Sequence, residues 1–325
     1  MDMTNTLISK VLVLDDAGMH FDGLKSFYAE CGLLGIRPQR SDDDSVVALL
    51  RSNIDLGGIM LYENFGGMPG RGIALARDIH DSRPELPLFL RRDVSASVAG
   101  LTERDAAMFR CAYTLDDLQP LRASLDASIF SRIYPNDLVR GITELTRASL
   151  QTLFRNCDVD IETPYLVKDR IIYGEVFTMI AIESNWCRGT MMLQAAEAAM
   201  LGLMPGKAAE GKPHGVRELN NLLGEATNMI WGSFKNRYVG QADRNAGLMQ
   251  TQVPIIINHR RNTISFGSED PQLCLKYTLR QHDAPAAAPV PLYQRFVFNL
   301  NWSPDDFKEN PSVESLVSSG ELEMF

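Results

Sequence analysis

The sequence predicts a mixed α/β protein with two domains, a flavodoxin-like N-terminal domain followed by an α+β domain. Short apolar runs alternate with amphipathic segments five times within the first 130 residues. This alternation predicts a parallel sheet that is covered by helices on both faces. The second half has two long amphipathic segments separated by apolar runs, which indicates helices packed on an antiparallel sheet. A chain of 325 residues is long enough for two domains of ordinary size.

The composition is that of a globular protein and argues against several classes of function. Hydrophobic residues make up 45% of the chain and charged residues 22%, both ordinary values. The 32 basic and 41 acidic residues give a net charge of −9, and no Lys/Arg-rich block is present. A protein that binds nucleic acid or an anionic membrane is therefore not expected.

The cysteines and histidines predict neither a disulfide framework nor a metal site. The five cysteines are widely spaced and the histidines are scattered singly, so we expect reduced structural thiols. No apolar run approaches the roughly 18 residues that a membrane-spanning helix needs, and the first residues lack the pattern of a secretion signal. We therefore expect a cytoplasmic protein that holds no cofactor of its own.

The first domain, residues 1–130, consists of five predicted strand–helix units. Its strands are expected at 10–14, 35–39, 58–61, 87–90 and 111–114, and its helices at 19–31, 45–52, 72–81, 95–109 and 117–132. Five such units predict the flavodoxin-like strand order, in which a functional site lies at the carboxyl ends of the strands. The acidic pair Asp15-Asp16 directly follows the first strand, and is therefore expected at that end of the sheet.

The second domain is predicted at 137–301, after a linker at 131–136 that contains Pro135. A long helix is expected from 137 to about 153, a central strand within 171–183 and a short helix at 195–204. After a helix at 216–238, strands are expected at 251–258, 263–266, 273–280 and 295–300. The acidic ending, 302–325, is predicted to be a loosely held tail.

The helix predicted at 216–238 carries a polar stripe beside its apolar face. The stripe consists of Glu218, Asn221, Glu225 and Asn228, so the pattern Glu-x-x-Asn occurs twice, one heptad apart. A carboxylate can capture a cation of a partner while an amide holds a water in line with a phosphorus atom, which favours phosphoryl hydrolysis by positioning. No His or Cys on the helix stands near enough to activate a nucleophile. The alternative is that the stripe is only the solvated side of an amphipathic helix.

The segment Glu218-Leu219-Asn220-Asn221-Leu222-Leu223-Gly224 resembles the helix motif of the CheC and CheX phosphatases of bacterial chemotaxis. The resemblance covers 136–300 and implies a CheX-like fold that hydrolyses the aspartyl phosphate of CheY-like receivers and forms a homodimer. It also implies that Glu218 pairs with a lysine of the receiver and that Asn221 orients the attacking water. The receiver would supply the aspartyl phosphate and Mg²⁺. Glu225 and Asn228 are a second match on the same helix, interpreted as coincidence or as a continuation of the stripe.

Residues 1–130 resemble a response-regulator receiver domain, most closely at Asp15-Asp16, because such a pair helps to hold Mg²⁺ in that family. Where the family has its phosphoacceptor aspartate, the chain has Tyr62-Glu63-Asn64. The resemblance therefore implies a pseudoreceiver that cannot be phosphorylated. Glu63 either mimics a charged aspartate or is a loop residue, and the acidic pair either binds a metal ion or forms a solvated turn.

Together these patterns predict a two-component signalling protein that dephosphorylates a separate receiver. The alternative is a non-catalytic, dimerising scaffold or adaptor that binds signalling partners through the same fold. A DNA-binding regulator would need a basic helix, which the sequence does not contain.

Overall fold

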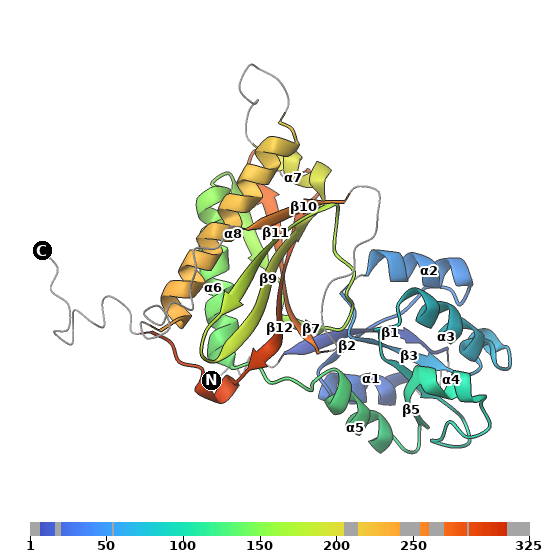
Figure 1. Cartoon of the computed structure of the whole chain (residues 1–325). Helices are drawn as coiled ribbons and strands as arrows, with labels where there is room; N and C mark the ends of the chain where they lie inside the picture. Colours follow the sequence, from blue (N-terminus) through green and yellow to red (C-terminus); the bar gives the residue numbers. More distant parts are fainter. Residues whose placement is uncertain are drawn as a thin grey trace, which may run out of the picture. The chain divides into compact units, whose positions relative to one another are not determined.

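The computed structural model describes residues 7–16, 21–53, 55–204, 214–240, 254–259, 270–284 and 286–310. The chain forms two compact units (Figure 1). Unit 1 comprises Met1–Ile133, Thr163–Ile172 and Thr263–Cys274, and unit 2 comprises Tyr134–Glu162, Tyr173–Asn262 and Leu275–Phe325. Two short segments from the second half of the sequence thus belong to the N-terminal unit, a division that the boundaries predicted from the sequence do not include.

Unit 1 is built on five parallel strands in the order β2-β1-β3-β4-β5. The strands are β1 (Ile8–Leu14), β2 (Leu33–Ile36), β3 (Gly58–Tyr62), β4 (Leu88–Arg91) and β5 (Phe109–Tyr113). Every residue of β4 is buried, as expected for a strand covered on both faces. The predicted parallel sheet is therefore present, and its carboxyl ends are the ends of β1, β3, β4 and β5.

Five helices connect and cover these strands: α1 (Phe21–Glu30), α2 (Asp43–Ser52), α3 (Arg71–Ser82), α4 (Glu103–Met108) and α5 (Gln119–Ser128). Helices α2, α3 and α4 pack with one face of the sheet in a single apolar core, and α1 and α5 lie on the other face (Figure 1). The helix predicted at 95–109 is too long. It begins only after Thr102, whose side chain accepts a hydrogen bond from the backbone N–H of Asp105 as an N-cap does.

A short strand from the second half of the sequence, β7 (Tyr165–Val167), pairs in parallel with the start of β1. The hydroxyl of Ser9 donates to the carbonyl oxygen of Leu166 at 2.8 Å. In the same segment, Asp169 forms an ion pair with Arg83 at 2.5 Å, and both side chains are buried. These contacts make residues 163–172 part of the fold of unit 1.

Unit 2 contains an antiparallel sheet in which β10-β8-β9-β12-β11 are neighbours and β6 pairs with β11. The strands are β6 (Cys157–Ile161), β8 (Val176–Glu183), β9 (Cys187–Ala195), β10 (Ile255–Asn258), β11 (Gln272–Gln281) and β12 (Val290–Trp302). Strand β8 lies between β10 and β9, in agreement with the prediction of a central strand there. The strand predicted at 263–266 lies outside the described residues.

Two long helices, α6 (Asn136–Leu153) and α8 (Val216–Tyr238), lie side by side on one face of this sheet (Figure 1). A third helix, α7 (Glu197–Leu203), is short. The bounds of α8 are those that its apolar spacing predicts. Its buried side chains recur every three or four residues, at Leu219, Leu223, Ala226, Thr227, Ile230, Trp231, Phe234 and Tyr238, so its polar stripe faces away from the core.

The segment after β12 is held against the carboxyl end of α8. Phe307 packs edge-on against Trp186, with ring centroids 5.1 Å apart. The backbone N–H of Asn310 donates to the carbonyl of Arg237 at 2.7 Å. The side-chain amide of Asn310 donates to the carbonyl of Val239 at 2.8 Å. Because these bonds satisfy carbonyls at a helix end, the expectation of a loosely held tail is wrong for residues 303–310. Residues 311–325 lie outside the described ranges.

Candidate functional sites

The first candidate site is the start of α8, where Glu218 takes part in capping the helix. The N-cap residue is Gly215, and its backbone N–H donates to Oε2 of Glu218 at 2.9 Å. This hydrogen bond to a carboxylate one turn into a helix satisfies an otherwise unpaired donor. It also lowers the pKa of Glu218 below its ordinary value. One oxygen of the carboxylate predicted to be catalytic is thus engaged by its own chain.

The second candidate site is an open groove of about 390 Å³ between α8 and β10. Three exposed residues of the polar stripe, Asn221, Glu225 and Asn228, line it. They stand at positions i, i+4 and i+7, a spacing that places them on one face of a helix. Ile256 of β10 and Pro254, directly before this strand, lie on the opposite side, and the remaining lining residues are Asn220, Gly224 and Met229. Glu218 does not line this groove.

Asn221, Glu225 and Asn228 present their polar groups to the groove. Within the described ranges, nothing makes a hydrogen bond or an ion pair with the side chains of Asn221, Glu225 or Asn228. A carboxylate and two amides can therefore contact a foreign molecule without first breaking a bond to another described residue. The arrangement suits the positioning of a cation and a water rather than nucleophilic attack.

In unit 1, the acidic pair lies at the carboxyl end of β1, but Asp15 is already neutralised. The Nε and Nη2 atoms of Arg91 donate to the two carboxylate oxygens of Asp15 at 2.6 and 3.1 Å. Both side chains are at most 5% exposed, so this is a buried, bidentate ion pair. Asp16 instead accepts a hydrogen bond from the backbone N–H of Gly66 at 2.8 Å.

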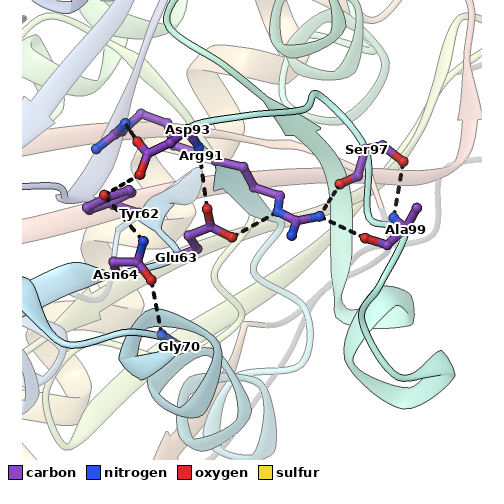
Figure 2. A network of polar contacts seen from close by, with 9 residues as sticks. Tyr62, Glu63, Asn64, Gly70, Arg91, Asp93, Ser97 and Ala99 are labelled. Carbon is purple, nitrogen blue, oxygen red and sulfur yellow. Dashed lines mark hydrogen bonds and ion pairs between the residues drawn. The ribbon is translucent and has the colours of Figure 1, made fainter.

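The guanidinium of Arg91 is held on two further sides. Its Nη1 atom donates to Asp93 at 3.0 Å, and its Cζ atom lies 3.7 Å from the centre of the Tyr62 ring, a cation–π contact. The hydroxyl of Tyr62 donates to Asp93 at 2.6 Å (Figure 2), and this bond raises the pKa of Tyr62. Arg91 thus joins the ends of β1, β3 and β4.

Glu63 is also paired, with the neighbouring arginine. Nε of Arg92 donates to Oε2 of Glu63 at 2.9 Å, and Nη1 of Arg92 donates to the carbonyls of Ser97 and Ala99. The charge of Glu63 is therefore neutralised within unit 1. Beside this network lies a pocket of about 550 Å³. It is lined by four apolar or glycine residues and by Tyr62, Arg91, Arg92, Asp93 and Asp116.

The carboxylates of the acidic pair are both engaged by donors of unit 1. A hard cation needs several oxygen ligands that converge on one point, whereas the carboxylates of Asp15 and Asp16 accept bonds from different donors. In the part of the chain that the structure describes, no group of three or more His, Cys, Asp or Glu side chains could hold a metal ion. Sequence reasoning assigned no role to Arg91 and Arg92, although their place at the carboxyl end of the fourth strand could have indicated one.

No described helix is both long enough and apolar enough to cross a bilayer.

Several solved structures resemble the chain, each over about half of its length. A putative chemotaxis protein from Desulfovibrio vulgaris Hildenborough is 18% identical, with a TM-score of 0.38, and the match covers 50% of this chain and 96% of that one. The chemotaxis protein CheX from Vibrio vulnificus is 19% identical, with a TM-score of 0.37, over 50% of this chain and 98% of that one. A CheX–CheY–BeF3–Mg²⁺ complex from Borrelia burgdorferi gives 12% identity and a TM-score of 0.31, over 50% and 97%. No curated protein sequence matches the chain.

The family comparison covers the second candidate site. Residues 176–278 match the model of the chemotaxis phosphatase CheX. This range begins at the first residue of β8 and includes α8 and β10. All four residues of the polar stripe and both walls of the groove therefore lie within the matched segment. Over residues 176–278, the chain is therefore similar to the chemotaxis phosphatase CheX family.

Proposed function

We propose that unit 2 hydrolyses the aspartyl phosphate of a separate, CheY-like receiver and that the groove between α8 and β10 is where it does so. The match of residues 176–278 to a phosphatase family supports the reaction class. The groove supports the place, because it presents a carboxylate and amides that have no partner among the described residues.

The geometry favours Glu225 and Asn228 as the catalytic pair. Both are exposed and line the groove, three residues apart on one face of α8. Glu218 accepts a hydrogen bond from Gly215 and lies outside the groove lining, so the pair Glu218 and Asn221 is the second assignment. Asn221 lines the groove as well, one turn before Glu225.

In the proposed mechanism this chain contributes positioning rather than a reactive nucleophile. The carboxylate of Glu225 pairs with a cationic side chain of the receiver, which fixes the receiver on α8. The amide of Asn228 holds a water in line with the phosphorus atom, where its attack displaces the aspartate carboxylate. The receiver brings the aspartyl phosphate and the Mg²⁺ that neutralises the developing charge, so no cofactor is assigned to this chain.

The observation that carries this proposal is the carboxylate–amide pair in an open groove inside a phosphatase-family segment. Its test is the decay of a receiver phosphorylated by a small phosphodonor in the presence of Mg²⁺. We expect Glu225→Ala and Asn228→Ala to slow the decay strongly, and Glu218→Ala to slow it only as far as it destabilises α8.

A matched control is Gln151→Ala, because Gln151 is an exposed amide on the neighbouring helix α6. Its decay rate should equal that of the wild type. If Glu218→Ala and Asn221→Ala abolished the activity while Glu225→Ala and Asn228→Ala kept it, the assignment of the pair would be reversed. Equal rates in all variants would rule out the reaction at this helix.

We further infer that unit 1 is a receiver-like unit that takes no phosphoryl group. Its strand order β2-β1-β3-β4-β5 supports this interpretation, as does the absence of an aspartate at the end of β3, where Tyr62 and Glu63 stand. Intact-mass measurement after incubation with a phosphodonor and Mg²⁺ should find no added phosphoryl group on this chain. A homodimer remains a prediction from the family resemblance, and light scattering of the purified chain tests it.

A further inference from the structure

We propose that the groove between α8 and β10 also selects the receiver, by accepting an apolar side chain that lies beside the aspartyl phosphate of that receiver. The proposal rests on the proposed function, and it concerns recognition rather than chemistry. It assigns the apolar wall of the groove and the glycine between its walls as determinants of specificity.

The groove has two unlike sides. Asn221, Glu225 and Asn228 of α8 line it with a carboxylate and amides, whereas Ile256 of β10, Pro254 just before that strand, and Met229 of α8 line it with apolar atoms. A phosphorylated aspartate is charged and gains nothing from burying these apolar atoms. Covering the apolar wall favours binding only if the same partner covers it with apolar surface. In the proposed complex, the partner presents a hydrophobic side chain next to its phosphorylated residue.

Gly224 keeps the space between the two sides open. A Cβ atom at this position would lie 3.4 Å from Cδ1 of Ile256 and would project into the groove. The backbone at Gly224 has no positive φ, so its conformation does not require a glycine. Because glycine within a helix is less stable than alanine, the missing side chain itself is the useful feature. It leaves a methyl-sized space against Ile256, which the tip of a foreign side chain can fill.

Strand alternation provides a control on the same strand. Successive residues of a strand point to opposite faces of the sheet, so Ile256 faces α8 while Ile255 points to the other face. Ile255 is 55% exposed and does not line the groove. The two isoleucines have the same side chain and adjacent positions, but they lie on opposite faces of the sheet.

The experiment measures kcat and KM of the full chain with a phosphorylated CheY-type receiver and Mg²⁺, the same probe as in the phosphatase assay. We expect Gly224→Ala and Ile256→Ala each to raise KM about tenfold, which is the usual effect of misfitting an apolar pocket by a methyl group or more. The value of kcat should stay close to that of the wild type. Ile255→Ala and Gly202→Ala, the latter in α7 where a Cβ would meet nothing within 4 Å, should leave both constants unchanged.

Thermal melting separates recognition from folding. Gly224→Ala should melt no lower than the wild type, because alanine favours the helix, so a rise in KM in this variant cannot come from instability. Unchanged KM in both Gly224→Ala and Ile256→Ala, while Glu225→Ala still loses activity, would overturn the inference and leave the proposed function standing. A fall in kcat with unchanged KM would also overturn it, since the groove would then hold only the reacting group. Failure of the proposed function would appear separately, as equal decay with Glu225→Ala.

Discussion

The carboxylate of Asp15 and the guanidinium of Arg91 form a buried, two-point ion pair at the carboxyl end of the sheet of unit 1, with bonds of 2.6 and 3.1 Å. Arg91 is 2% exposed and Asp15 5%. Arg91 thus balances, within the protein, the negative charge of Asp15 that solvent or a metal ion would otherwise stabilise.

Removing the arginine from this pair should destabilise unit 1 strongly. We expect Arg91→Met to lower the free energy of unfolding by about 3–5 kcal/mol, because Asp15 remains buried without a counter-charge. Urea denaturation measures the change. The double variant Asp15→Asn/Arg91→Met should recover part of the loss, and a single variant as stable as the wild type would show that the pair is not buried in solution.

Magnesium should not stabilise the wild-type chain. A ligand that binds only the folded state raises its stability in proportion to the occupancy of its site, and here the carboxylate of Asp15 is held by Arg91. We expect the same melting temperature with and without millimolar MgCl₂, with Arg91→Met as the comparison in which Asp15 is released. A rise in the wild-type melting temperature with MgCl₂ would contradict this arrangement.

The ion pair between Arg83 and Asp169 should be worth far more than a surface pair in unit 2. Asp169 is fully buried and lies 2.5 Å from Arg83, so Asp169→Ala should lower the free energy of unfolding by about 3–5 kcal/mol. The control is Asp160→Ala, because Asp160 is 58% exposed in its pair with Arg280 and should cost at most about 1 kcal/mol. Urea denaturation of both variants measures the two losses, and equal losses would contradict the burial of the pair between Arg83 and Asp169.

Glu218 should contribute to stability in a pH-dependent way. Its pKa lies below the ordinary 4.5 because the N–H of Gly215 donates to the carboxylate. A lowered carboxyl pKa means that the contribution is fully present above pH 4.5 and is lost as the pH falls through the folded-state value. Glu218→Gln keeps an acceptor without a charge, so we expect its difference in melting temperature from the wild type to shrink as the pH falls below 4.5. A difference that stays constant with pH would show that Glu218 does not cap α8.

The extent to which the sequence predicts this structure varies with how local each feature is. The bounds of α8 follow from its own apolar spacing, and the five parallel strands follow from a repeated local pattern. The helix predicted at 95–109 is too long. Helical propensity alone extends it to residue 95, whereas the N-cap at Thr102 fixes its start at Glu103. The pairing of β7 with β1 depends on Ser9 and Leu166, which are 157 positions apart, and no local pattern encodes it.

The same distinction applies to the candidate sites. Sequence spacing places all four stripe residues on one face of α8, but it cannot tell which pair is available. The backbone N–H of Gly215 engages Glu218, and β10 completes the groove at Glu225 and Asn228. Likewise, Asp15 and Arg91 lie 76 positions apart, so their pairing becomes visible only in the folded chain.

The most direct test of the central claim is a single-turnover measurement of phosphoryl loss from a phosphorylated CheY-type receiver with excess protein and Mg²⁺. The wild type should accelerate the loss, and Asn228→Ala should reduce the accelerated rate about a hundredfold, because the attacking water is no longer held in line. Folding of the variant is checked by its melting temperature. If folded Asn228→Ala accelerated the loss as fast as the wild type does, catalysis by the α8 groove would be contradicted.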